Sequence, residues 1–317
     1  MAAKWKMESQ RDTFAQALVD LGKERSDIVV LSADLSSSVK TGVFAKHFPE
    51  RHFNIGIAEQ NMISMAAGMA AAGKTVFVST FAIFGTGRVY DQIRQSVAYP
   101  HLKVILVLTH AGITVGGDGA THQMIEDLAL MRVLPNMTVI VPADAPETRK
   151  AVMAAANNPG PVYIRLGRSE VPTVTKPEDP FEIGKATVLR DGGDVTLIGT
   201  GIMVAKCLEA AEELTKHGVE ARVINLSTIK PLDVKTIVKA ARETGAVVTA
   251  EEHNVVMGMG SAVALELVEN VHVPMKRVGI PDMFGESGEP DQLMEKYGLT
   301  VDNIVDAAHD VMGRKKK

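Results

Sequence analysis

The sequence is poor in cysteine, in aromatic side chains and in net charge. One cysteine, Cys207, in 317 residues excludes an intramolecular disulfide framework, which favours an intracellular protein. Aromatic residues make up only 4%, so the core must be built from aliphatic side chains and the 16 methionines. A formal net charge of −4 gives no electrostatic reason to bind nucleic acid.

Long apolar runs are also missing. No stretch reaches the ~20 residues that a membrane helix needs. The N-terminus carries charges where a signal peptide would place its apolar region. The sequence therefore predicts a cytoplasmic protein with neither a nucleic acid nor a membrane as partner.

Short apolar strands alternate with amphipathic helices from residue 14 to residue 166. Such alternation predicts a mostly parallel sheet, here of six strands, with helices on both faces. The predicted strands are 28–31, 52–54, 74–79, 103–109, 138–141 and 162–166, and the predicted helices are 14–22, 59–72, 88–96, 125–133 and 146–157.

Three prolines, Pro172, Pro177 and Pro180, then interrupt the periodicity and indicate a linker. A second alternating series follows, with strands at 195–199, 221–225, 246–250 and 275–278 and helices at 203–216, 234–241, 261–268 and 301–312. The sequence thus predicts an α/β protein of two doubly wound domains. We expect the first at residues 1–172, the linker at 173–184 and a smaller second domain at 185–317.

Two loops at predicted strand ends carry polar groups. In His52–Gln60, HFNIGIAEQ, the acid Glu59 falls in the first turn of a predicted helix, where it either complements the helix dipole or acts in a site. The hydroxyl-rich stretch Ser32–Ser38 is placed either to bind a ligand or to cap a helix, and the sequence leaves both open.

Further motifs give these loops a context. HFNIGIAEQ is followed by STFAIF at Ser79–Phe84, THAGITVGGDGATHQ at Thr109–Gln123 and IRLGRSEVP at Ile164–Pro172. In order and spacing they resemble the pyrimidine-binding domain of transketolases, which use thiamine diphosphate. VVTAEEHNVVMGMGSAV from Val247 and RVGIPDMFGESG from Arg277 resemble the transketolase C-terminal domain. The resemblance covers essentially the whole chain. A full-length transketolase has a further domain, which precedes the part that matches residue 1 of this chain.

The resemblance implies a coenzyme site at three residues. Glu59 matches the acid that shares a proton with N1′ of the aminopyrimidine, so that the 4′-imine can deprotonate C2 and leave the nucleophilic ylide. Phe81 and Phe84 match the ring-stacking positions, although plain core phenylalanine is an equally common role. Where some transketolases have a third aromatic, this chain has Gly87 or Arg88.

The resemblance also implies a sugar-phosphate site. His122, which we expect to be catalytic with Glu59, and Asp118 match residues against the C1 and C2 oxygens of the donor ketose. The remaining matches are to phosphate contacts, namely Arg11, Ser38, His110 and Arg168. A structural histidine and a surface arginine are the ordinary alternatives for each one singly. Glu251 and His253 receive no catalytic role.

No metal site is predicted in this chain. Gly117-Asp118-Gly119 and Asn157-Asn158 are too far apart for the thiamine-enzyme metal motif, and the first half lies inside the substrate motif. The resemblance therefore implies that a partner chain, the N-terminal subunit of a split transketolase, binds the diphosphate and Mg²⁺ (or Ca²⁺). An α2β2 heterotetramer would transfer glycolaldehyde between sugar phosphates in the pentose phosphate pathway.

Three alternatives share parts of the pattern. The C-terminal part of deoxyxylulose-5-phosphate synthase shares GIAEQ, STF and YDQ at Tyr90–Gln92, but lacks a histidine at the place of His110. The β subunit of 2-oxoacid dehydrogenases shares the split organisation without the Asp118 to His122 pattern. A noncatalytic scaffold of the same fold is the third, and intact Glu59, Asp118 and His122 argue against it.

Overall fold

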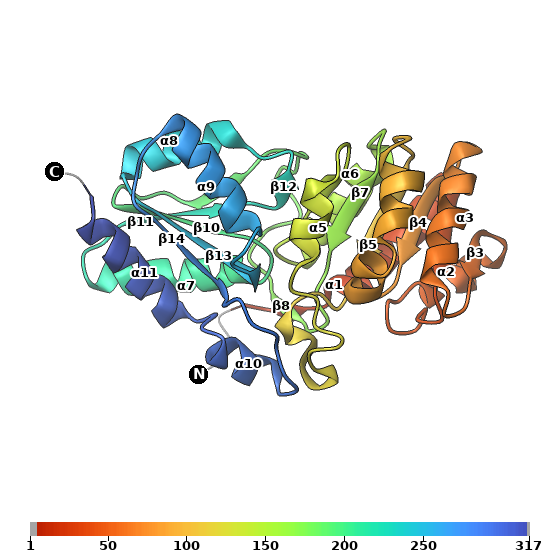
Figure 1. Cartoon of the computed structure of the whole chain (residues 1–317), viewed down its shortest axis with the longest axis horizontal. Helices are drawn as coiled ribbons and strands as arrows, with labels where there is room; N and C mark the ends of the chain where they lie inside the picture. Colours follow the sequence, from red (N-terminus) through yellow and green to blue (C-terminus); the bar gives the residue numbers. More distant parts are fainter. Residues whose placement is uncertain (1–4, 316–317) are drawn as a thin grey trace.

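Two α/β domains lie side by side along the long axis of the molecule, as Figure 1 shows. The computed structural model describes residues 5–315. The ends of the two predicted domains, residues 1–4 and 316–317, lie outside the described part. The predicted class of two α/β domains is confirmed.

The first sheet contains all six predicted strands and one more. Its order is β12-β6-β7-β5-β4-β2-β3. The six strands of the first domain run parallel. The seventh, β12 (Thr228–Lys230), comes from the second domain and pairs antiparallel with β6. The predicted count of six strands is therefore one too few. The other strands are β2 Ile28–Ser32, β3 His52–Asn54, β4 Thr75–Ser79, β5 Val104–Leu108, β6 Thr138–Ile140 and β7 Val162–Arg165.

Helices bury both faces of this sheet. Ile28 and Val30 of β2 face the core beneath α1, α2 and α6, whereas Val29 and Leu31 face the core beneath α3, η3 and α5. Strands buried on both sides need continuous apolar runs, which is the pattern seen here. The helices are α1 Gln10–Glu24, α2 Gly42–His47, η1 Pro49–Arg51, α3 Glu59–Ala71, η2 Ile83–Gly87, α4 Tyr90–Gln92, η3 Ile93–Ala98, η4 Ile113–Asp118, α5 Asp127–Val133 and α6 Ala145–Asn157.

Local signals explain where the regular helices begin. The Ser9 side chain accepts a hydrogen bond from the Asp12 amide at the start of α1, and Asp144 does the same for Glu147 in α6. The single helix predicted at 88–96 is wrong, because this stretch begins with a turn at residues 88–89 and is then divided between α4 and η3. Both η2 and η3 are wound as π-helices, which are often found at functional sites.

The second domain has a five-stranded sheet in the order β14-β13-β10-β11-β9. The four predicted strands are present and parallel, and β9 adds an antiparallel edge. Cys207 of α7 is fully buried. The strands are β9 Thr187–Arg190, β10 Val195–Gly199, β11 Ala221–Asn225, β13 Val247–Asn254 and β14 Met275–Ile280, and the helices are α7 Met203–Lys216, α8 Val234–Thr244, α9 Met259–Asn270, α10 Pro290–Lys296 and α11 Val301–Gly313.

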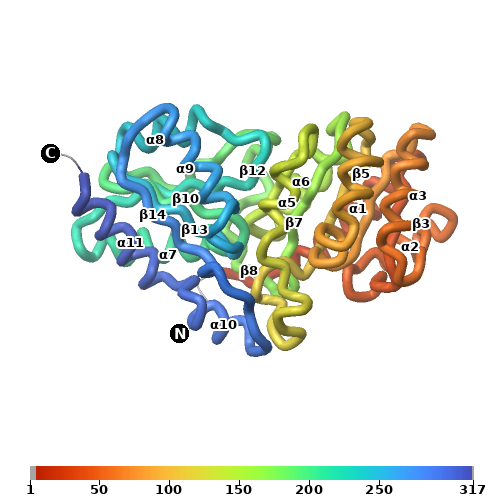
Figure 2. The backbone as a smooth tube through the Cα atoms, in the orientation of Figure 1, coloured from red at the N-terminus to blue at the C-terminus, as the bar shows by residue number. Residues whose placement is uncertain are grey.

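The two domains are joined by more than a linker. The tube view in Figure 2 shows β12 close to the first domain, away from the remaining strands of its own domain. One hydrophobic core contains Val139 of β6, Ile224 of β11 and Met259 of α9. A two-stranded ribbon of β1 (Met7–Glu8) and β8 (Val171–Pro172) lies at the domain boundary (Figure 1). Within residues 5–315, none of the helices has the length and apolar character needed to cross a bilayer.

Candidate functional site

The predicted site residues follow the carboxyl ends of neighbouring strands of the first sheet. Across the sheet order β7-β5-β4-β2-β3, the residues just beyond each strand are Arg168, His110, Phe81, Ser38 and Glu59. In open α/β sheets this edge is where ligands bind. Parallel pairing of the strands therefore brings residues as far apart in the sequence as Ser38 and Arg168, which are 130 residues apart, to the same edge of the sheet.

Glu59 is buried at the first turn of α3, with 3% of its surface exposed. Its Oε2 accepts a hydrogen bond from Nη1 of Arg88 at 3.0 Å. The Arg88 guanidinium also lies over the Phe84 ring, with its central carbon 4.5 Å from the ring centroid. One planar cation thus contacts both the acid and the aromatic face of the predicted coenzyme site.

Four rings continue from this cation into the molecule. Phe84 and Phe81 are nearly parallel, at an interplanar angle of 17° and a centroid distance of 5.9 Å. Phe81 stacks on the His110 imidazole at 3.7 Å, and Phe84 meets His122 edge-on at 5.5 Å. Such contacts stabilise a fixed arrangement of rings. The structure therefore places the predicted coenzyme residues and both histidines in one continuous array.

His110 is held in an unusual state. Its backbone is left-handed, with φ of +59°, and its Nδ1 lies 2.8 Å from the Thr109 hydroxyl. Burial, with help from the nearby positive charges of Arg11 and Arg168, lowers the pKa of His110 to about 3. The imidazole is therefore neutral at physiological pH and offers hydrogen bonds rather than charge.

Two cations converge on the same edge. Nη1 of Arg11 donates to the Ser38 carbonyl at 2.8 Å, and Nη1 of Arg168 donates to the Val115 carbonyl. Burial and the charge of Arg168 lower the pKa of Arg11. Helix α2 begins without a side-chain cap, so helix capping does not explain the hydroxyls of Ser32–Ser38. Arg11, Ser38, His110 and Arg168 together form an electropositive, polar end of the site.

Asp118 is the one predicted site residue that stands apart. It is exposed at the end of η4, and among the described residues it makes no hydrogen bond or ion pair. His122 follows four residues later and is half-buried, with its Nδ1 2.9 Å from the Thr121 hydroxyl. The geometry brings His122 into the ring array but leaves Asp118 at its rim.

The side chains fit one half of thiamine diphosphate. An aminopyrimidine is flat and carries N–H donors, so it needs an enclosed carboxylate and an aromatic face. The Arg88 guanidinium, also flat and rich in N–H donors, already makes both contacts with Glu59 and Phe84. Within the described residues no group of three or more His, Cys, Asp and Glu could hold a metal ion.

The glycines of the second domain do not form an anion cradle. Gly258 and Gly260 open helix α9, but the Glu251 carboxylate occupies the helix start, where it accepts hydrogen bonds from the Met259 and Gly260 amides. Burial raises the pKa of Glu251 to about 7. The structure thus uses the amides of this turn for an internal contact with Glu251.

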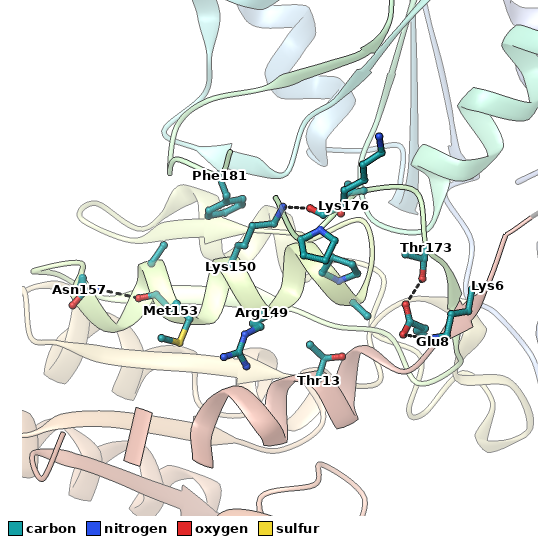
Figure 3. A pocket seen from close by; sticks show the side chains of 15 residues that line it. Lys6, Glu8, Thr13, Arg149, Lys150, Met153, Asn157, Thr173, Lys176 and Phe181 are labelled. Atoms are coloured by element: carbon teal, nitrogen blue, oxygen red, sulfur yellow. Dashed lines mark hydrogen bonds and ion pairs between the residues drawn. The ribbon is translucent and has the colours of Figure 1, made fainter. Parts of the chain in front are cut away.

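A separate hollow of about 810 Å³ lies between α6, β1 and the segment after β8 (Figure 3). It contains none of the predicted site residues. Its basic side chains are largely engaged: Lys150 donates to two backbone carbonyls, Arg149 pairs with Asp20 and Lys6 pairs with Glu8. This hollow has no array of rings and acids comparable with that around Glu59.

Sequence reasoning missed two features of the site. Arg88 was noted only as a departure from the aromatic pattern, and its pairing with Glu59 spans 29 residues. The contacts of the loop 110–123 with the second domain were not foreseen. Gln123, the last residue of the THQ motif, bonds to Glu286 across 163 residues, and local sequence carried no signal of it.

Comparisons with known proteins agree on the family. Residues 7–174 match the transketolase pyrimidine-binding domain, and residues 184–304 match the transketolase C-terminal domain. A protein of Methanocaldococcus jannaschii described as a transketolase C-terminal section is 46% identical, covering 98% of this chain and 97% of its own length. A 6-deoxy-6-sulfo-D-fructose transketolase subunit of Clostridium sp. (strain MSTE9) is 46% identical, with coverages of 96% and 95%. The solved structure of a split-gene transketolase, an inactive β4 tetramer, has 54% identity and a TM-score of 0.92, covering 97% of this chain and 99% of its own.

Proposed function

The chain belongs to the transketolase family, and from that membership we propose that it is the C-terminal subunit of a split transketolase. The enzyme would transfer a two-carbon glycolaldehyde unit from a ketose phosphate to an aldose phosphate. The observation that carries this proposal is the continuous array from Glu59 through Phe84 and Phe81 to His110, with His122 at its side. An acid, an aromatic wall and two imidazoles are the groups that this chemistry requires.

The proposed roles come from the family resemblance, and the geometry of the side chains supports them. Bound thiamine diphosphate would supply a nucleophilic carbon that takes up the two-carbon unit. Glu59, being buried, would hold a proton at N1′ of the ring, and Phe81 and Phe84 would fix the ring plane. His122 would exchange a proton with the sugar oxygens, and Asp118, exposed at the end of η4, would approach them from the rim. Neutral His110 would donate or accept a hydrogen bond near the sugar phosphate.

The phosphate end would be formed by three further side chains. Arg11 and Arg168 supply positive charge, and Ser38 supplies a hydroxyl at the same strand edge. A guanidinium suits phosphate oxygens because its donors lie in one plane. A sugar phosphate would therefore lie between this end and the ring array.

We also propose that a second chain completes the enzyme. This chain covers nearly the whole length of the relatives that are described as a C-terminal section or a subunit. An N-terminal subunit would bind the diphosphate and Mg²⁺ or Ca²⁺, and an α2β2 assembly would hold both halves of each site. The domain limits 1–172 and 185–317, with a linker at 173–184, stay a proposal.

Reconstitution tests the proposal. The chain is mixed with its candidate N-terminal partner, thiamine diphosphate and Mg²⁺, and assayed with xylulose 5-phosphate and ribose 5-phosphate. We expect turnover from the mixture and none from this chain alone. Turnover by this chain alone would refute the split enzyme, and consumption of pyruvate instead would favour a synthase or dehydrogenase.

A matched pair of variants tests the role of Glu59. Glu59→Gln keeps the shape but cannot hold the proton at N1′ in the same way, so we expect turnover to fall by at least about 100-fold. Glu50→Gln removes an exposed acid two-thirds open to solvent and should leave turnover unchanged. Near-normal turnover of Glu59→Gln would remove the central assignment.

A further inference from the structure

The loop 110–123, which carries His110, Asp118 and His122, packs against the second domain as well as against its own. Ile113 is fully buried, and together with Ile125 it belongs to the core that lies under α7 and α11. That core is otherwise built from the second domain, for example from Ile280 and Leu293. The loop is therefore anchored by its apolar side chains in the neighbouring domain.

Polar contacts fix the loop in the same place. The Thr114 amide donates to Oε1 of Glu252 at 2.8 Å, and Glu252 belongs to β13 of the second domain. Nε2 of Gln123 donates to the Glu286 carbonyl at 2.9 Å, and more weakly to the Ile113 and Gly116 carbonyls of its own loop. Gln123 is 3% exposed, so these bonds have little competition from water.

The surfaces meet without spare room. A methyl group on Gly285 would lie 2.0 Å from Oε1 of Gln123, and one on Gly119 would lie 2.5 Å from Oγ of Ser287. A methyl group on Gly112 would come within 2.2 Å of the Glu252 carboxyl group. At each of these positions the added methyl group would meet a side chain across the domain boundary, and Gly112 and Gly119 also have left-handed backbones, with φ of +81° and +73°, which favour glycine. A shift of the segment 281–289 therefore has to move the loop.

We propose that the second domain positions the substrate loop, with Gln123 as the positioning residue and the segment 281–289 as its support. The inference rests on the proposed function, because it assumes that His122 and Asp118 meet the ketose phosphate. Gln123 directly follows His122, so the bond to Glu286 fixes the backbone that aims the imidazole. Displacement of such a group by about 1 Å can cost on the order of 100-fold in rate. The second domain thereby takes part in substrate recognition without touching the coenzyme residues Glu59, Phe81 and Phe84.

A substitution in the second domain tests this directly. Gly285→Ala pushes against the Gln123 amide, whereas Gly193→Ala adds a methyl group with no neighbour within 4 Å and is the matched control. In the reconstituted enzyme we expect Gly285→Ala to raise the KM for xylulose 5-phosphate about tenfold or more. The dissociation constant of thiamine diphosphate should stay within about twofold of wild type, because Gln123 and Gly285 contact Ile113, Gly116 and Glu286 rather than Glu59, Phe81 or Phe84. Gly193→Ala should change neither value.

A second variant and a second measurement keep the test decisive. Gln123→Met keeps the length but cannot donate, so it should reproduce the rise in KM, and the double variant should be no worse than either single one. In the free chain, hydrogen exchange of the amides in 113–123 should be faster in Gly285→Ala and in Gln123→Met than in wild type or Gly193→Ala.

The outcomes separate the two proposals. If wild-type enzyme turns over but both variants keep the wild-type KM and exchange rates, the positioning role is wrong. An equal loss of coenzyme affinity and substrate affinity in both variants would also overturn it, because that pattern indicates general damage. If the wild-type mixture neither binds thiamine diphosphate nor turns over ketose phosphate while the free-chain exchange differences persist, the proposed function fails and the loop anchoring stands.

Discussion

A buried charge at the domain boundary gives the sharpest stability prediction. Oδ2 of Asp127 accepts hydrogen bonds from the Tyr163 hydroxyl at 2.5 Å and from Nε of Arg165 at 2.7 Å. Nη2 of Arg165 in turn donates to the Glu252 carbonyl of the second domain at 2.9 Å. Asp127 is fully buried and Arg165 is 6% exposed, so neither charge can be satisfied by water if its partner is lost.

The magnitude follows from that burial. Removing one member of a buried ion pair typically costs about 3–5 kcal/mol, because the other charge is left uncompensated. We expect Asp127→Ala to lower the free energy of unfolding by about this amount. Burial lowers the pKa of His253 to about 4, so its ring is neutral, and its Nδ1 lies 2.7 Å from the Asn254 carbonyl. Nε2 of His253 is then an acceptor, 4.0 Å from Oδ1 of Asp127.

This arrangement makes asparagine a different test from alanine. In Asp127→Asn the new amide can donate to Nε2 of His253 once the two atoms, 4.0 Å apart in the wild type, approach by about 1 Å, and such a hydrogen bond is worth about 1 kcal/mol. Oδ1 of Asp127 and Nε2 of His253 both lack a hydrogen-bond partner among the described residues, so the new bond costs no existing one. We therefore expect Asp127→Asn to be less destabilising than Asp127→Ala by about 1 kcal/mol or more.

Urea unfolding of the free chain, followed by circular dichroism, measures these differences. Asp306→Asn alters an exposed acid of α11 and serves as the control. Asp127→Asn combined with Arg165→Met removes both charges and should be more stable than Asp127→Ala. A loss below about 1 kcal/mol in Asp127→Ala, or an asparagine variant as unstable as the alanine variant, would refute the reasoning.

Three further predictions concern single side chains. In the reconstituted enzyme, Arg88→Gln should tighten thiamine diphosphate binding about fivefold, because the coenzyme no longer has to displace the half-exposed ion pair of Arg88 with Glu59, which is worth about 1 kcal/mol. A fluorescence titration measures this, and weaker binding would show that Arg88 is a coenzyme contact instead. Because the pKa of His110 is depressed to about 3 in the folded chain, the unfolded chain binds more protons below pH 6.5, and the contribution of His110 to stability is lost as pH falls from about 6.5 to 3. His110→Asn should therefore flatten the pH dependence of the melting temperature in this range. An unchanged slope would contradict the assignment. Burial raises the pKa of Cys207 to about 12, so iodoacetamide should label it only when urea unfolds the chain, and labelling of the native chain as fast as that of free cysteine would contradict its burial.

The sequence predicts best those strands that have a layer of helices on both faces of the sheet. In the first domain β2, β4, β5 and β7 are buried along their whole length between two layers of helices, so their apolar continuity is a sufficient signal, whereas β3 is an exposed edge strand without an apolar run. The strand β12 is three residues long, and its partner β6 belongs to the other domain. Thr228–Lys230 has no pattern that distinguishes an edge strand from a loop, and which sheet it joins depends on how the domains pack. The π-helical turns of η2 and η3 escaped for a related reason, since helical periodicity alone does not separate them from an α-helix.

For the site, the same division holds between strand edges and tertiary contacts. Glu59, Phe81, His110 and Arg168 each follow a strand, so once the sheet is parallel their convergence at one edge follows from the topology. Arg88 belongs to no strand end, and its place on Glu59 depends on the broken helix between η2 and α4. The sequence alone therefore does not predict the contact between Arg88 and Glu59.

The loop 110–123 shows why a second domain accompanies this sheet at all. A glycine-rich loop with left-handed residues at His110, Gly112, Gly116 and Gly119 has little stiffness of its own, because glycine restricts the backbone weakly. A group that must meet a substrate within a fraction of an ångström cannot depend on such a loop unless something outside it supplies the rigidity. The second domain does so through the buried Ile113 and through polar contacts to Thr114 and Gln123, and the first sheet supplies only the strand on which the loop begins. The boundary that is evident in the fold is therefore not a boundary in the site: the ring array belongs to one domain, and the loop that would present the substrate to it is held by both.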